Sequence, residues 1–195
     1  MKILIDNGHG VDTAGKRSPD GRLREYAYAR EIAKRLESKL KIWGYDAERI
    51  VTEETDISLS ERCRRANLYC RKLGAKNVLL VSIHNNAAGA DGQWHDARGW
   101  SAHVSLNASV NSKALARHLI EAAETNGLKV RKYSHQVPYV AQNLAICRDT
   151  LCPAVLTENL FQDNREDVDY LLSEAGKQKI ADIHVLGIIN YIQQL

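Results

Sequence analysis

Residues 78–84, with the sequence VLLVSIH, form the stretch that decides the fold. The run from Val78 to Ile83 is almost entirely apolar and rich in β-branched residues, which is typical of a central strand covered on both faces. His84 stands at the carboxyl end of this run. Because ligands of open α/β sheets bind beyond the carboxyl ends of the strands, the stretch predicts a covered sheet with a functional residue at its edge.

Strands and helices alternate on both sides of this run. We expect further strands at residues 2–6, 45–51, 99–106 and 153–157. Helical spacing, capping residues and terminal glycines indicate helices at 25–44, 58–74, 111–126 and 177–193, and a short helix capped by Asn164. Residues 86–97 are expected to form a polar loop, and 128–150 is the least regular stretch. The alternation predicts a single α/β domain over residues 1–195, with a mostly parallel (mixed) central sheet flanked by helices.

The composition excludes several classes of protein. A chain of 195 residues with 44% hydrophobic and 26% charged residues suits one folded domain rather than a disordered segment. The net charge of +3 is small and no basic stripe carries interleaved aromatics, so no nucleic-acid partner is expected. No apolar run approaches the roughly 18 residues that span a bilayer, which predicts no membrane span. The first residues form no secretory signal, so the chain starts in the cytoplasm or has lost its leader. We expect a monomer.

The four cysteines do not have the spacing of a structural zinc site, because none forms a C-x-x-C pair. Cys63 and Cys70 lie near one face of the helix predicted at 58–74, where they serve as small apolar residues. Cys147 and Cys152 flank a possible turn and could pair if oxidised. We expect free thiols throughout.

Four polar residues stand where chemistry is expected. His9, His84 and Glu158 each follow a predicted strand, and Glu25 opens a predicted helix. A catalytic zinc needs three protein ligands and an open position, and a further carboxylate can move the water's proton. Each residue also has an ordinary structural alternative. Histidines at strand ends are commonly structural. Glu25 could instead interact favourably with the positive end of the helix dipole, and an arginine could neutralise Glu158.

Several stretches, taken in order, resemble the amidase type 3 group of zinc-dependent N-acetylmuramoyl-L-alanine amidases. The similarity runs from about residue 2 to 192. The stretches that carry it are ILIDNGHG (3–10), the loop with Gly15 and Gly21 leading to Glu25, the helix with Leu59, Arg62, Ala66 and Asn67, VSIHNNA (81–87), NLAICR (143–148), PAVLTE (153–158) and NLFQDNRE (159–166).

This resemblance implies that His9, Glu25 and His84 bind Zn²⁺ and that Glu158 is the catalytic carboxylate. It implies a hydrolase that cuts peptidoglycan between N-acetylmuramic acid and the L-alanine of the stem peptide. Val11 and Asn159 depart from the common pattern of the family. These two departures bear on loop shape and substrate preference rather than on the metal ligands. The compact layout favours a phage-type lysin, cytoplasmic until release, over a bacterial autolysin. Either would act at the bacterial cell wall, in the periplasm or outside the cell.

Three other functions are alternatives for the same four candidate residues. A zinc exopeptidase acting on stem peptides would use the same donor set. A non-catalytic cell-wall-binding module is disfavoured because all four matching positions are intact. A glycosidase with Glu25 and Glu158 as its carboxylates would leave His9 and His84 without a role. Neither G-x-G-x-x-G nor a P-loop occurs, so no organic cofactor is expected.

The remaining histidines and aromatics are assigned by position alone. His95 and His135 lie in loops that could line the cleft, whereas His118 and His184 lie in helices and are structural or exposed. For His103 we favour a structural role over orienting a ligand. Two further pairs have alternative roles: Trp94 and Trp100 as a cleft wall or as packing residues, and Asn85 and Asn86 as donors to a peptide carbonyl or as turn formers.

Overall fold

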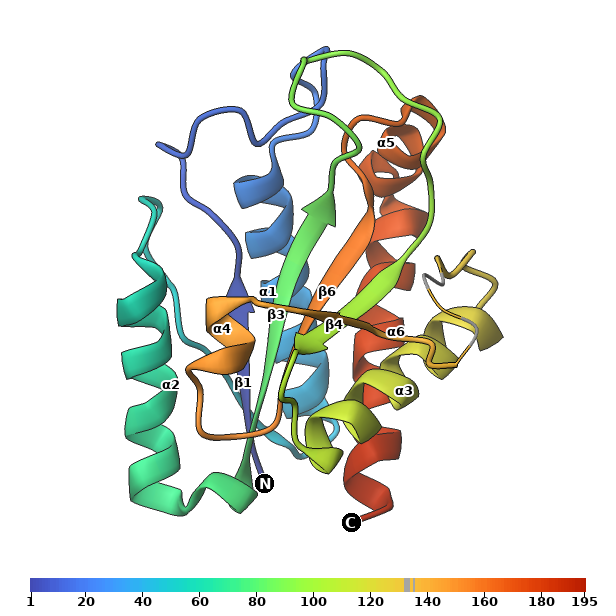
Figure 1. Cartoon of the computed structure of the whole chain (residues 1–195). Helices are drawn as coiled ribbons and strands as arrows, with labels where there is room; N and C mark the ends of the chain where they lie inside the picture. Colours follow the sequence, from blue (N-terminus) through green and yellow to red (C-terminus); the bar gives the residue numbers. More distant parts are fainter. Residues whose placement is uncertain (132–133, 135) are drawn as a thin grey trace.

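The computed structural model describes residues 1–131, 134 and 136–195, and its centre is a six-stranded sheet with the order β2-β1-β3-β6-β4-β5 (Figure 1). The strands β1, β2, β3 and β6 are mutually parallel, whereas β4 runs antiparallel to β6 and parallel to β5. The predicted mixed, mostly parallel α/β sheet is therefore confirmed. The strands are β1 (Lys2–Asn7), β2 (Asp46–Arg49), β3 (Val78–Asn86), β4 (Ser101–Ser105), β5 (Val140–Gln142) and β6 (Ala154–Phe161).

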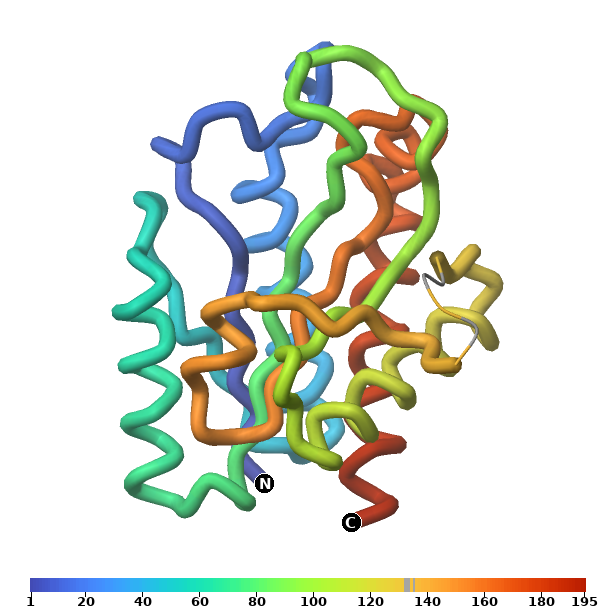
Figure 2. The backbone as a smooth tube through the Cα atoms, viewed as in Figure 1, coloured from blue at the N-terminus to red at the C-terminus, as the bar shows by residue number. Residues whose placement is uncertain are grey.

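Helices cover both faces of the sheet, as Figures 1 and 2 show. One layer holds α2 and α4, and the other holds α1, α3, α5 and α6. The helices are α1 (Glu25–Ile42), α2 (Leu59–Leu73), α3 (Val110–Thr125), α4 (Ala145–Arg148), α5 (Arg165–Leu172) and α6 (Glu174–Gln193), with a 3₁₀ turn η1 (Ala75–Asn77) before β3.

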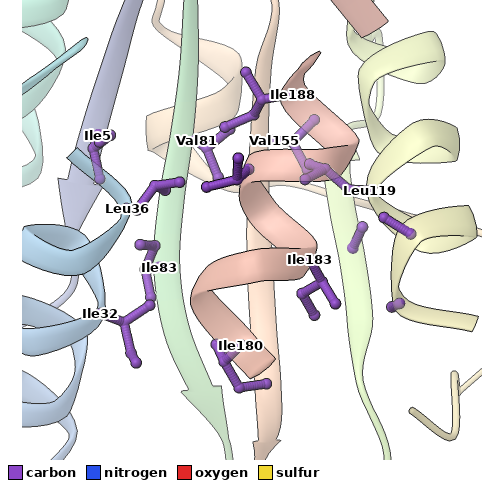
Figure 3. Close-up of a cluster of buried hydrophobic side chains, with 14 of the residues drawn as sticks. Ile5, Ile32, Leu36, Val81, Ile83, Leu119, Val155, Ile180, Ile183 and Ile188 are labelled. Carbon is purple, nitrogen blue, oxygen red and sulfur yellow. The ribbon is translucent and has the colours of Figure 1, made fainter. Parts of the chain in front are cut away.

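The apolar run of β3 is continuous because its alternate side chains enter two separate cores. Leu79, Val81 and Ile83 pack with α1, α3 and α6 (Figure 3), whereas Val78 and Leu80 pack with α2 and α4. Successive side chains of a strand point to opposite faces, so a strand with helices on both sides needs apolar residues at every position.

Local sequence sets the helix ends as expected. The Ser58 hydroxyl accepts a hydrogen bond from the Glu61 amide at 3.3 Å, and the Asn164 side chain accepts one from the Asp167 amide at 3.1 Å. Gly74, with a φ of 85°, ends α2. The start of α6 was placed too late, because Ser173 caps that helix by accepting from the Gly176 amide at 3.0 Å.

Two other expectations were wrong. His84 and Glu158 lie within β3 and β6 rather than just beyond them, because the β3–β6 ladder continues past both residues through a register shift. The stretch 128–150, expected to be the least regular, contains only the short elements β5 and α4 among its described residues. Both elements are too short to show a period in the sequence.

The cysteines are free thiols, as expected. Cys152 has its thiol against that of Cys70 rather than against Cys147. Within the described residues, no helix is both long and apolar enough to cross a membrane.

Candidate metal centre

Two imidazoles and one carboxylate converge at the carboxyl ends of the central strands. His9 follows β1, His84 lies on β3, and Glu25 is the first residue of α1. The Oε1 atom of Glu25 is 3.3 Å from Nε2 of His9 and 3.1 Å from Nδ1 of His84. One ligand atom from each residue lies within 4.8 Å of the others, and in the described part of the chain this is the one such group of three.

The glycines beside His9 are required by close approach. A Cβ on Gly8 would lie 2.3 Å from Cε1 of His84, and a Cβ on Gly10 would lie 2.0 Å from the backbone nitrogen of Asp56. His9 itself has a φ of 61°, in the left-handed region that side chains other than glycine rarely adopt. The backbone thus brings one imidazole against the other, with their ring centroids 5.0 Å apart.

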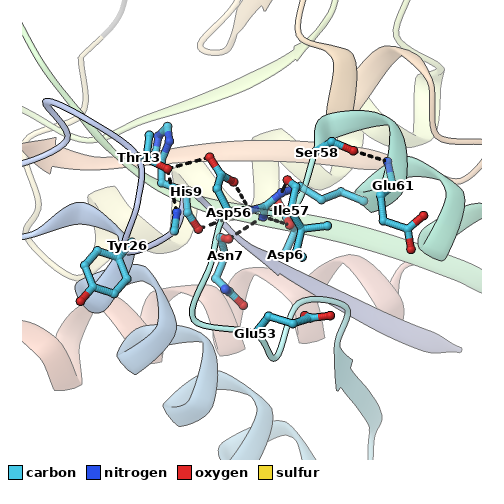
Figure 4. A network of polar contacts seen from close by, with 12 residues as sticks. Asp6, Asn7, His9, Thr13, Tyr26, Glu53, Asp56, Ile57, Ser58 and Glu61 are labelled. Carbon is cyan, nitrogen blue, oxygen red and sulfur yellow. Dashed lines mark hydrogen bonds and ion pairs between the residues drawn. The ribbon is translucent and has the colours of Figure 1, made fainter.

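A buried arginine, Arg62, fixes this strained loop. Figure 4 shows Asp6, Asn7, His9 and Asp56, which are among its partners, gathered in one polar network. The Nη1 atom of Arg62 donates to Oδ1 of Asp6 at 2.7 Å and to the carbonyl of Asn7 at 2.6 Å. Its Nη2 atom donates to Oδ1 of Asp56 at 2.9 Å and to the carbonyl of His9 at 3.3 Å. In the sequence, Arg62 is recognisable only as part of a motif, because most of the partners that give it this positioning role lie far from it in the chain.

Glu25 has more than a capping role. Its side chain is 1% exposed, and Oε1 also accepts a hydrogen bond from the Asn85 amide at 3.1 Å. Burial alone would raise the pKa of Glu25, but hydrogen bonds with His84 and His9 outweigh burial and lower it. The second oxygen, Oε2, is buried and has no hydrogen-bond partner among the described residues. An ionised carboxylate with one unpaired oxygen suits a bound cation.

Glu158 has the opposite electrostatic environment. It pairs in register with His84 across β3 and β6, and its Oε2 atom is buried without a partner in the described structure. Burial raises the pKa of Glu158 to about 7, with the charge of Glu25 adding to the effect and those of His84 and Lys16 opposing it. No ion pair with an arginine is found among the described residues. A carboxyl group of this kind can exchange a proton near neutral pH.

A cavity of about 400 Å³ opens over these residues. His9, His84, Glu158 and Lys16 line its polar part. Its apolar lining comes from the start of α2 and the residues before it, from α4 and the residue before it, and from β6, through Ile57, Leu59, Leu144, Ala145, Ile146 and Leu156. The arrangement can therefore hold a metal, a reacting polar bond and an apolar group beside it.

Of the two roles left open for Trp94 and Trp100, the structure supports packing. Trp100 is fully buried and donates from its indole to Oδ1 of Asn159 at 2.7 Å. Trp94 packs under the guanidinium of Arg165, 4.5 Å from the ring centroid, and is outside the described lining of the cavity. Both tryptophans pack within the fold instead. Asn85 is also buried and donates to the carbonyl of Asn159 at 2.6 Å, so it does not face a substrate.

The other polar candidates have structural partners. His103 is hydrogen-bonded by Ser101 and Gln142, which confirms the structural role. His184 is fully buried in α6, and His118 lies on α3, as expected. His95 is paired with Asp91 on the loop after β3. The Asn86 side chain caps the Ala87 amide at 2.9 Å, which is the turn-forming role. His135 lies outside the described residues.

A covered α/β sheet that gathers two imidazoles, a carboxylate and a second buried carboxylate beside a cavity is the framework of a hydrolase, and its three clustered donors are of the types that bind metal ions. The chain belongs to the N-acetylmuramoyl-L-alanine amidase family, whose family model matches residues 3–190. The resemblance seen in the sequence is thereby confirmed.

Two curated relatives and one solved structure show the extent of the similarity. The chain is 29% identical over 188 residues to the endolysin of Bacillus phage SPP1, covering 95% of this chain but only 64% of the phage protein. It is 30% identical over 191 residues to the N-acetylmuramoyl-L-alanine amidase CwlM of Bacillus licheniformis, covering 96% and 67% of the two chains. The crystal structure of an N-acetylmuramoyl-L-alanine amidase from Clostridium difficile 630 superimposes with a TM-score of 0.82 at 27% identity, covering 98% and 96%.

Proposed function

We propose that this chain is a zinc-dependent peptidoglycan hydrolase that cleaves the amide between N-acetylmuramic acid and the L-alanine of the stem peptide. The observation that carries the proposal is the meeting of His9, His84 and the half-unpaired Glu25 carboxylate beside the separate buried carboxylate of Glu158. Family membership and the names of the relatives point to the same bond.

The spacing of the Glu25 carboxylate from the two imidazoles fits zinc. Zinc bonds of about 2.0–2.1 Å in a tetrahedron place neighbouring donor atoms roughly 3.3 Å apart. The Oε1 atom of Glu25 is 3.3 Å and 3.1 Å from the two imidazole nitrogens. His9, Glu25 and His84 would hold Zn²⁺ with a position left for substrate and water. The bound ion would polarise the scissile carbonyl and acidify a water molecule.

Glu158 supplies the proton transfer. Its carboxylate takes the proton of the attacking water, holds it at a carboxyl oxygen, and delivers it to the leaving L-alanine nitrogen. A pKa of about 7 suits both steps, because the group can be deprotonated before attack and protonated after it. His9 and His84 are oriented by Glu25, by the Arg62 network and by the two flanking glycines.

Residues 1–195 would form one catalytic domain that works as a monomer at the bacterial cell wall. The relatives include both a phage endolysin and a bacterial amidase, so the proposal covers lysin and autolysin roles alike. Nothing in the site favours the exopeptidase or the binding module. The unpaired buried oxygens of Glu25 and Glu158 are better explained by a metal and a reacting substrate.

The test measures bound metal and the bond that is cut. Zinc content is determined by elemental analysis for the wild type, His84→Ala and Glu158→Gln. Cleavage of a disaccharide-peptide is followed by mass spectrometry and by labelling the new amino termini. We expect about one zinc per chain in the wild type and in Glu158→Gln, loss of zinc in His84→Ala, and activity in the wild type alone. New amino termini on residues other than L-alanine would instead identify a peptidase, and a metal-free wild type with full activity would overturn the zinc centre.

A further inference from the structure

A second cavity lies beside the metal centre at the same edge of the sheet. It has a volume of about 290 Å³ and lies between three loops, at residues 15–19, 87–93 and 162–163. Figure 1 shows the loops after β1 and β3 above the carboxyl ends of the strands. Its walls include five residues with little or no side chain, namely Gly15, Gly89, Gly92, Ala87 and Ala90. These residues leave an open space with polar groups at its boundary.

Two residues that line this cavity each carry a buried hydrogen-bond acceptor without a partner among the described residues. Gln162 is 2% exposed and Asp163 is 5% exposed. Oε1 of Gln162 and Oδ1 of Asp163 are buried without a hydrogen bond in the described structure. The other oxygen of Asp163 is held by the amides of Ala88 at 2.7 Å and Gly89 at 3.0 Å. Buried acceptors without donors are costly, so two of them on residues that line one cavity indicate a ligand that donates.

The two cavities differ in chemistry. The cavity over the metal centre has an apolar wall, through Ile57 and Leu156 among others, which suits the methyl groups of a peptide. The second cavity offers carboxylate and carboxamide oxygens between small residues, which suits a ring bearing hydroxyl and acetamido N–H donors. The loop 15–17 separates them, because Lys16 lines the first cavity and Gly15 and Arg17 line the second.

We propose that the second cavity binds a sugar ring of the glycan strand, with Gln162 and Asp163 accepting hydrogen bonds from it. This rests on the proposed function, in which the scissile amide joins a glycan to a peptide. A substrate held at the metal must then extend in two directions. The apolar cavity takes the stem peptide, and the polar cavity takes the glycan.

The test compares two substrates that share the scissile amide. One is a disaccharide-peptide, and the other is a lactoyl-peptide in which the sugar is absent. The variants are Gln162→Met and Asp163→Asn, which remove an acceptor with little change of shape, and Ala90→Trp, which fills the cavity from an exposed position. Gln178→Met on α6 is the matched control, and all variants are compared by thermal unfolding.

We expect the wild type to prefer the disaccharide-peptide. The three cavity variants should lose about tenfold or more in kcat/KM on that substrate, and keep the wild-type value on the lactoyl-peptide. Equal losses on both substrates would show that these residues only support the loops, and no loss on either would show that the sugar lies elsewhere. Both results overturn the proposal.

A binding measurement separates this inference from the catalytic one. The peptide-free disaccharide is titrated into the wild type and the variants by calorimetry. Saturable binding to the wild type that weakens in Gln162→Met and Asp163→Asn supports the glycan site even if neither substrate is cleaved. Binding that is unchanged in the variants, or competition by the sugar-free stem peptide alone, contradicts it.

Discussion

Replacing Arg62 by methionine should destabilise the protein strongly. The guanidinium makes five hydrogen bonds, to Asp6, Asp56 and the carbonyls of Asn7, His9 and Ile57. The side chains of Arg62 and Asp6 are only 3% and 2% exposed. Methionine keeps the apolar stem of the side chain but leaves the Asp6 carboxylate buried without its cation. Removing one partner of a buried pair costs about 3–5 kcal/mol.

The free energy of unfolding should therefore fall by about 3–5 kcal/mol in denaturant titrations. For a chain of this size that corresponds to a decrease in Tm of roughly 6–20 °C. Arg64→Met on the same helix is the control, since Arg64 is 56% exposed and pairs with Glu61 at the surface. Its effect should stay within about 0.5 kcal/mol.

A double-mutant cycle isolates the ion pair. With Asp6→Asn already in place, Arg62→Met no longer strands a buried charge, so its cost should shrink by about 1 kcal/mol or more. The zinc affinity of Arg62→Met should also fall, because the carbonyl of His9 loses one of its two arginine donors. If Arg62→Met and Arg64→Met were equally stable, the network would contribute nothing and the reasoning would be wrong.

Three further measurements follow from the same structure. Gly8→Ala places a Cβ 2.3 Å from the His84 ring, so we expect the zinc affinity to fall by about tenfold or more. A competition titration with a chelating dye measures this, and an unchanged affinity would contradict the close approach. Burial lowers the pKa of His184 from 6.5 to about 4. Between pH 6.5 and pH 4, therefore, His184 is protonated in the unfolded chain but neutral in the folded protein. Stability should thus be complete above pH 6.5 and fall by about 3 kcal/mol towards pH 4, and His184→Gln should lose this part of the pH dependence of unfolding. Zinc at a free concentration 100 times its Kd should stabilise the wild type by about 2.7 kcal/mol in thermal unfolding, an effect that His84→Ala should lack.

The sequence was sufficient for the features that local patterns encode. The run from Val78 to Ile83 identified the central strand because both of its faces are covered, and Ser58 and Asn164 marked helix starts through their own hydrogen bonds. His9 and His84 were candidates because each follows a predicted parallel strand, and parallel strands bring their carboxyl ends to one edge. Their ligand atoms do lie within 4.8 Å of each other and of Glu25, which the family resemblance rather than its place in a strand had singled out.

Features that depend on distant partners could not be predicted in this way. The role of Trp100 could not be decided from the sequence, because its hydrogen-bond partner, Asn159, lies 59 residues away in the chain. The ends of β3 and β6 depend on the ladder between them, which no local pattern records. Likewise, Gln162 and Asp163 are unremarkable in sequence, and only the folding of residues 87–93 around them leaves their acceptors buried and unpaired.

The two buried glutamates show how one type of side chain comes to suit two roles. Glu25 and Glu158 share one cluster, and burial favours the neutral form of each. Glu25 lies between two imidazoles that stabilise its charge, which suits a ligand that must stay ionised. Among the described residues Glu158 has no such hydrogen bond, so burial raises its pKa to about 7, which suits a group that must gain and lose a proton. Environments that separate the pKa values of neighbouring carboxyl groups are the usual basis for assigning acid–base roles, and here they support the assignment we propose.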